Sequence, residues 1–140
     1  MTSGSNRSSL SAPVMFNLTL SFLLVLIVIF TIPFIIYGSL ASFLDLKTPA
    51  ELSPIAFLLN VLISKIGTAA TFVLIFNFTN NSLNGHWLLY AIIWLPLFIF
   101  GEISQTIEQN YSWKEAVVGI ISEIIYLPIS AYIVDLLIKT

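Results

Sequence analysis

Three ionisable side chains, Lys65, Glu102 and Glu123, are the residues of this chain most able to do chemistry, because each interrupts a long apolar stretch. Lys65 is the one charge in the 27 residues from Leu52 to Phe78, which are otherwise almost entirely apolar. A charge at the middle of a membrane-spanning helix is costly unless it is neutralised, paired or hydrated. We therefore expect the rest of the chain to supply what Lys65 needs.

The spacing of these charges predicts that Lys65 meets Glu123. Lys65 follows Pro54, the expected start of its helix, at a distance of about 16 Å along the axis. Glu123 follows Trp113, the expected start of another helix, at about 15 Å. Both depths are close to the middle of a hydrocarbon core that is about 30 Å thick. We predict a Lys65–Glu123 contact, with Glu102 one or two turns nearer the surface from which both helices enter.

This polar set has three interpretations. Lys65 and Glu123 could form a structural ion pair that fixes how two helices pack. The three residues together could instead form a polar path for an ion, a proton or a small substrate, because intramembrane ionisable groups often mark such paths. Lys65 could also extend to an interface and pair with nothing.

A second polar pattern lies in the same stretch as Lys65. Four amide and hydroxyl side chains recur there at spacings of 4, 4 and 3 residues, which places them on one helix face. Such a face suits close packing against another helix, with hydrogen bonds between the two, while pore lining is the alternative. The four residues are Asn60, Ser64, Thr68 and Thr71.

The composition predicts an integral membrane protein. Of the 140 residues, 58% are hydrophobic and 9% are charged, whereas about 25% of an ordinary globular domain is charged. Such a chain could not present a solvated surface to water. The net charge of −2 is too small to indicate a nucleic-acid partner. The expected partners are the lipid bilayer and other membrane subunits, or further copies of this chain.

The residue types exclude several kinds of site. The chain has no Cys, which excludes disulfides, thiolate metal sites and thiol nucleophiles. Its single His, His86, leaves most zinc sites without ligands, and we interpret it as an ordinary interfacial residue. The sequence contains no Gly-rich phosphate loop and no hydrolase or zinc-protease motif. We expect no catalytic residue, no metal and no cofactor.

Four membrane-spanning helices must position these residues. Because the connections are short, sequential helices should be antiparallel, which predicts an all-α, up-down-up-down bundle. We expect the second and fourth helices to be the more buried and the first and third to face lipid. The expected segments are a flexible polar tail over residues 1–15 and a single domain over 16–140, with spans at about 16–40, 53–78, 86–105 and 113–138.

Local signals mark two of the helix starts. Ser53 before Pro54 resembles a helix cap followed by Pro at the first helical position. Ser112, with Glu115 three residues later, resembles a capping box. One broad face of the fourth helix carries its polar and small residues, which are Glu115, Gly119, Ser122, Glu123, Tyr126 and Ser130.

These features favour a non-enzymatic subunit that supports a membrane complex, because the small loops leave little room for a soluble activity. The alternative is a small homo-oligomeric transporter or channel that uses Lys65, Glu102 and Glu123. An enzyme acting on lipid within the membrane is a third class. Four spans place both termini on one side of the membrane, and we expect that side to be cytoplasmic.

Overall fold

The computed structural model describes residues 11–46, 53–108 and 112–139, and these residues form four α-helices. All four helices are long and apolar enough to cross a membrane. The prediction of an all-α protein with four long apolar helices is therefore confirmed. The helices are α1 (Ala12–Leu44), α2 (Pro54–Thr79), α3 (Trp87–Ile107) and α4 (Trp113–Ile138).

The first helix is longer at both ends than the span expected over residues 16–40. It begins at Ala12, with a proline in its first turn, where the missing N–H of proline is no loss. It ends at Leu44, because the next residue, Asp45, has a positive φ of 53°, and the Asp45 N–H donates to the carbonyl of Ala41. Four residues of the expected tail are thus helical, and residues 1–10 lie outside the described part of the chain.

The two predicted helix caps are confirmed. The hydroxyl of Ser53 accepts a hydrogen bond of 3.2 Å from the backbone N–H of Ala56. Ser112 and Glu115 form both halves of a capping box, in which each side chain accepts from the other residue's backbone N–H. These contacts satisfy backbone donors that a helix start otherwise leaves without partners.

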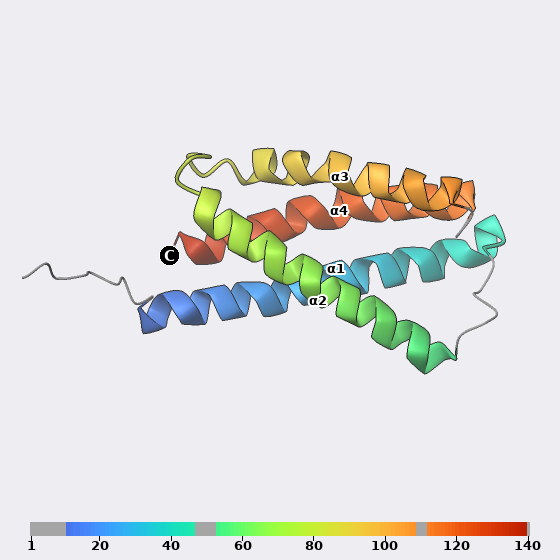
Figure 1. The fold of residues 1–140 in the computed structure, drawn as a ribbon, viewed down its shortest axis with the longest axis horizontal. Coiled ribbons are helices and arrows are strands. Elements are labelled where there is room, and N and C mark those ends of the chain that lie inside the picture. The colour runs from blue at the N-terminus through green and yellow to red at the C-terminus, as the bar shows by residue number, and fades with distance from the viewer. Residues whose placement is uncertain (1–10, 47–52, 109–111, 140) are drawn as a thin grey trace, which may run out of the picture.

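The fourth helix is the centre of the molecule. It packs against α1 on one side and against α3 on the other, and α2 packs mainly on α1. In Figure 1, α1, α3 and α4 lie lengthwise, while α2 crosses them obliquely. The C-terminal ends of α1 and α3 lie at the same end of the molecule as the N-terminal ends of α2 and α4 (Figure 1).

Burial follows this arrangement and corrects part of the prediction. Half of the most apolar stretch of α4 is buried, as expected. The expectation that α2 would also be well covered was wrong, because only 17% of the corresponding stretch is buried, the same share as in α1. The oblique crossing explains the difference. The buried residues of α2, Ala69, Phe72, Val73 and Phe76, all lie in its C-terminal half.

Large aromatic side chains join α2 to α3. Phe72 and Phe76 each make an edge-on contact with Tyr90, at centroid distances of 4.8 and 4.9 Å. The Tyr90 hydroxyl donates a hydrogen bond to the carbonyl of Phe72. The ring contacts continue from Trp94 through Phe98 to Tyr126 on α4. They tie three helices together and lead toward the charged cluster described below.

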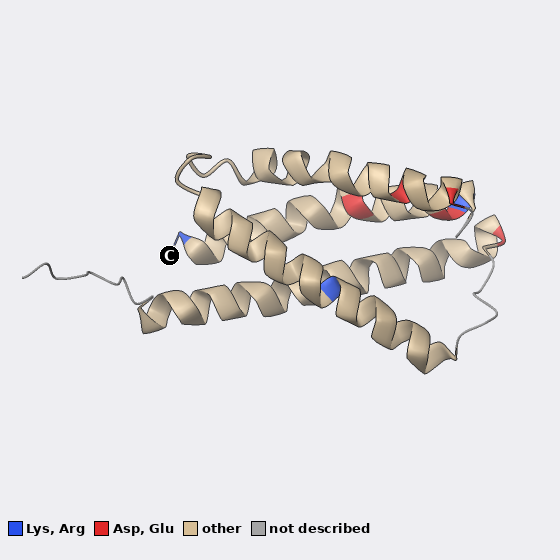
Figure 2. Ribbon diagram, viewed as in Figure 1, with Lys and Arg blue, Asp and Glu red and all other residues tan. Residues whose placement is uncertain are grey.

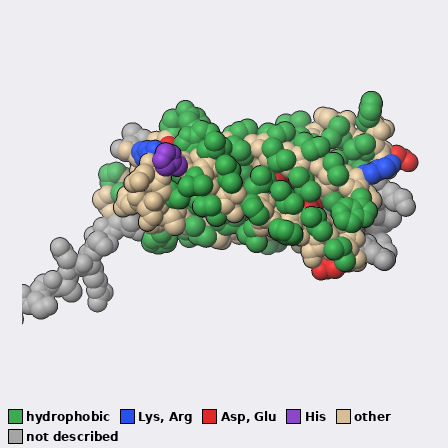
Figure 3. Space-filling model, turned by 90° about the horizontal axis from the view of Figure 1, so that it is seen from above, with side chains coloured by type: hydrophobic (Ala, Val, Ile, Leu, Met, Phe, Trp, Pro, Cys, Tyr) green, Lys and Arg blue, Asp and Glu red, His purple; other side chains and the backbone are tan. Residues whose placement is uncertain are grey.

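The outer surface matches a protein surrounded by apolar solvent. The face seen in Figure 3 is mostly hydrophobic, and its charged side chains gather toward the two ends. Figure 2 shows charged residues within α2, α3 and α4, whereas α1 has none from Ala12 to Leu44. The charges inside the helical body are therefore few, and their placement needs an explanation.

Candidate functional site

The third and fourth helices bring two carboxyl groups together. Glu102 on α3 and Glu123 on α4 come within hydrogen-bonding reach of each other, because the Glu102 carboxyl lies against α4 at Gly119, one turn before Glu123. A carboxylate has only acceptor oxygens, so a hydrogen bond between two carboxyl groups requires that one of them carries a proton. Glu123 is only 4% exposed, and its Oε2 makes no hydrogen bond within the described residues. The pair is therefore a buried polar centre in an apolar surrounding.

Gly119 makes room for this pair. It lies on α4 one turn before Glu123, and a Cβ built on it would lie 2.6 Å from the Cδ of Glu102 and within 2.8 Å of both carboxyl oxygens. Real Cβ atoms essentially never approach other atoms this closely. The carboxyl of Glu102 thus lies directly against the α4 backbone, in the space that any other residue at this position would fill.

Lys65 reaches the pair from α2 across the ring of Tyr126. The Lys65 Nζ lies 5.6 Å from the centre of that ring, within the roughly 6 Å at which a cation is attracted by an aromatic face. Tyr126 is three residues after Glu123, on the same face of α4. Lys65 also interacts electrostatically with Glu123 and Glu102. The three charged residues singled out from the sequence therefore lie in one cluster.

The form of the cluster differs from the predicted ion pair. Lys65 contacts α4 through the ring of Tyr126, and a hydrogen-bonded Lys65–Glu123 ion pair is not among the contacts of the residues that the structure describes. Counting residues along two helices predicts the depth of each group. It carries no information on the angle at which α2 crosses the others, which sets the direction from which Lys65 approaches (Figure 1).

Two tyrosines complete the polar surroundings. The Tyr126 side chain is 1% exposed, its hydroxyl has no hydrogen-bond partner among the described residues, and it interacts electrostatically with both carboxyl groups. On α1, the Tyr37 hydroxyl donates a 3.0 Å hydrogen bond to the carbonyl of Glu115. It also interacts electrostatically with the carboxyl groups of Glu102 and Glu123. Each of the four helices thus contributes one or more polar residues. Tyr37 was not singled out from the sequence, because nothing in its local pattern distinguishes it.

The polar face predicted on α2 lies largely on the surface of the chain. Asn60, Ser64 and Thr71 are exposed, and Thr68 is half-buried. The Thr68 hydroxyl donates to the carbonyl of Ser64 within the same helix, at 3.1 Å. In Figure 1, the half of α2 that begins at Pro54 diverges from the other helices. The predicted role of this face in helix packing stays a prediction.

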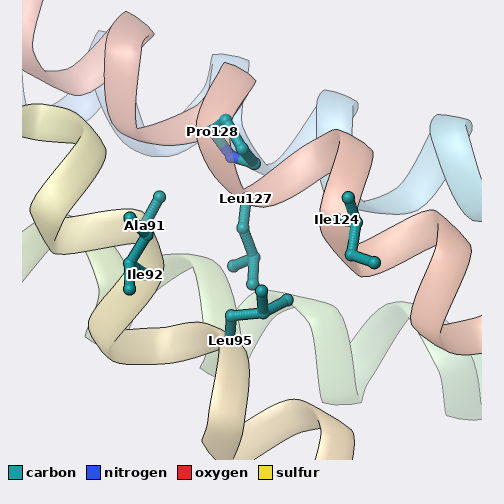
Figure 4. Close-up of a pocket in the computed structure, with 6 residues that line it drawn as sticks. All are labelled: Ala91, Ile92, Leu95, Ile124, Leu127 and Pro128. Carbon is teal, nitrogen blue, oxygen red and sulfur yellow. The ribbon is translucent and has the colours of Figure 1, made fainter.

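Two hollows between helices of the described part of the chain have largely apolar linings. A cavity of about 30 Å³ lies between α3 and α4, and Figure 4 shows its lining of alkyl side chains and Pro128. A larger, open hollow of about 310 Å³ lies between α2 and α3, at Ile75, Tyr90 and Leu97. Acidic and basic side chains line neither hollow. They lack the convergent polar groups that orient a substrate in a typical ligand pocket.

Within the described residues, no group of three or more His, Cys, Asp or Glu side chains is placed to hold a metal ion. His86 is exposed and occupies the position before α3.

Comparisons of the chain with protein-family models, with curated proteins and with solved structures found no match. The geometry itself offers two features, the Glu102–Glu123 pair near Lys65 and the exposed polar half of α2.

Proposed function

We propose that this protein is a multi-pass integral membrane protein that serves as a non-enzymatic subunit of a membrane complex. The four helices would cross the bilayer as an antiparallel up-down-up-down bundle, with both termini on the cytoplasmic side. Their length and apolar composition support the insertion. The observation that carries the subunit role is the N-terminal half of α2, which exposes a row of amide and hydroxyl groups outside the bundle.

The depth of this row makes exposure to lipid unfavourable. Asn60 lies about 9 Å and Ser64 about 15 Å from the start of α2, so both would lie within the hydrocarbon core. A polar side chain that faces lipid can find partners only on its own helix, whereas a hydrogen bond to another helix contributes roughly 0.6 to 2 kcal/mol. Gly67 adds open space, since a Cβ built there meets nothing within 4 Å. The face is suited to close approach by another helix.

The occupant that fits is a transmembrane helix of another subunit with small and uncharged polar side chains. The row on α2 carries hydrogen-bond donors and acceptors and no charge, so it would leave a charged partner without a counter-charge inside the membrane, which is costly. Ser64 and Thr68 are short enough to let two backbones approach closely, as in other helix pairs with small residues. A lipid-facing role does not explain why these groups share one face.

Single-cysteine cross-linking tests this proposal, because the natural chain has no Cys. Asn60→Cys and Ser64→Cys are expected to form cross-links in native membranes to a second polypeptide, which mass spectrometry identifies. Leu59→Cys and Ile66→Cys are matched controls, because these exposed residues lie on other faces of α2. Equal cross-linking at all four positions would contradict the proposal, and cross-links only between copies of this chain would replace it with self-association.

A second candidate, a small homo-oligomeric transporter or channel, is favoured by one specific observation. The Glu102–Glu123 pair and Lys65 place three ionisable groups inside the helical body, where such groups often mark ion or proton paths. Purified protein in liposomes would then conduct an ion or protons, and Glu123→Gln would abolish that flux. Flux of this kind would displace the subunit proposal, and its absence would leave the carboxyl pair without a transport role.

A further inference from the structure

The carboxyl pair supports an inference that goes beyond both candidate functions. We propose that Glu102 and Glu123 together bind a single proton, so that the pair and Lys65 form a buried cluster with no net charge. The site is built rather than incidental, since Gly119 leaves the space in which the Glu102 carboxyl reaches its partner. This inference does not depend on the proposed subunit role, because it concerns one chain without any partner.

The first argument is the closeness of the two carboxyl groups. They lie within hydrogen-bonding reach of each other, with the Glu102 carboxyl directly against α4 at Gly119, and two carboxylates would offer acceptors without a donor. They would also repel each other strongly at this distance in surroundings of low dielectric constant. A single proton shared between the two groups supplies the donor and removes one of the two negative charges.

The second argument is a charge count. With one proton, the pair carries one negative charge, which the ammonium of Lys65 balances. With no proton the cluster would be left with a net negative charge, and with two protons it would be left with the positive charge of Lys65. A net charge inside a membrane is costly. Among the states in which Lys65 carries its charge, the neutral arrangement with one proton on the pair is therefore the most stable.

The third observation concerns a different residue, Tyr126. The Tyr126 hydroxyl is buried and has no hydrogen-bond partner among the described residues, yet it interacts electrostatically with both carboxyls. A phenol can donate to a carboxylate or accept from a carboxylic acid. The Tyr126 hydroxyl can therefore hydrogen-bond to the pair whichever of the two carboxyl groups carries the proton. Among the described residues, Tyr37 on α1 and Lys65 on α2 also interact electrostatically with the pair.

The position of Glu102 indicates where this proton exchanges with water. Glu102 is half-buried, whereas Glu123 is buried. Glu102 lies five residues before Ile107, the end of α3, so it is about 7 Å from that end of the helix. The end of α3 adjoins the start of α4, and several charged residues lie at this end of the molecule (Figure 2). The proton would enter at this end through Glu102.

Infrared spectroscopy of the purified protein at neutral pH tests how many protons the carboxyl pair binds, because a protonated carboxyl group has its own carbonyl band. The wild type is expected to show the band of one buried carboxylic acid. In Glu102→Gln and in Glu123→Gln, one carboxylate remains beside Lys65 and the band is expected to vanish. In Lys65→Met, neutrality requires two protons, so the band area is expected to double. Glu108→Gln, an exposed residue at the end of α3, should leave the band unchanged.

Each variant decides the question separately. A band that persists in either glutamine variant would show that burial alone protonates the remaining carboxyl, and would overturn the shared proton. A band of unchanged area in Lys65→Met would overturn the charge count. Circular dichroism establishes that each variant is folded, and if one fails to fold, the remaining two still test the proposal. A flux assay or a search for partners would not change any of these outcomes.

Discussion

Replacing Gly119 by alanine tests the geometry of the carboxyl pair directly, because it changes no ionisable group. The added Cβ would lie 2.6 Å from the Cδ of Glu102. Carbon atoms ordinarily approach to about 3.5 to 4.0 Å, so the carboxyl must move by about 1 Å or more. The carboxyl is at the end of a flexible side chain and can move. The movement is expected to break its hydrogen bond to Glu123 while leaving the helices folded.

The size of the effect follows from two opposing contributions. Alanine in place of glycine within a helix stabilises by about 1 kcal/mol. Loss of a hydrogen bond that involves a charged group costs about 1.5 to 3 kcal/mol. The expected net result for Gly119→Ala is a loss of about 0.5 to 2 kcal/mol in the free energy of unfolding. Gly67→Ala and Gly101→Ala are matched controls, because a Cβ at either site meets nothing within 4 Å, and both should stabilise.

Reversible unfolding in detergent micelles, followed by circular dichroism, measures these differences. The same substitution in a Glu102→Ala background separates the contact from other causes. With the carboxyl removed, alanine at position 119 should stabilise as it does in the controls. The reasoning is refuted if Gly119→Ala is as stable as Gly67→Ala, or if it still destabilises when the Glu102 carboxyl is absent.

Three further experiments each test one contact of the structure. Lys65→Leu and Glu123→Leu are expected to destabilise together by less than the sum of the two single changes, with a coupling of about 1 kcal/mol, and a double variant that costs the sum would show no interaction. Tyr90→Phe should cost about 1 kcal/mol in thermal unfolding, since it removes the hydrogen bond to the Phe72 carbonyl, whereas Tyr132→Phe, at an exposed residue, should cost nothing measurable. Ser112→Ala removes the capping box and should lower stability by about 1 kcal/mol in the same assay, and no change would indicate that the start of α4 is held by other contacts.

The sequence predicts the helices well because their signals are local. An apolar run long enough to span a bilayer and a cap such as Ser112 with Glu115 need no tertiary information. The shared face of Gly119 and Glu123 on α4 also follows from helical periodicity, and the structure buries both residues. These predictions hold because a helix fixes the relative positions of residues three or four apart.

The contacts between helices depend on the angles at which whole helices cross. Helical periodicity in the sequence carries no information on these angles. The matched depths of Lys65 and Glu123 bring them into one cluster, but the direction of approach places Lys65 over the Tyr126 ring. The partnership of Glu102 with Gly119 requires knowing which face of α3 meets α4. The exposure of Asn60 likewise follows from the oblique placement of α2, which leaves its first half uncovered.

Lys65 connects the two unusual features of the molecule. It lies where α2 changes from its exposed N-terminal half to the half that begins to be buried at Ala69. A partner helix over the first half would exclude the water that a charged side chain such as Lys65 draws into a bilayer, and electrostatic interactions strengthen as the local dielectric constant falls. The attraction between Lys65 and the carboxyl pair would then increase. Occupation of the α2 face would favour the neutral, singly protonated cluster. An assembly contact on one side of α2 would therefore change how tightly the carboxyl pair on the other side holds its proton.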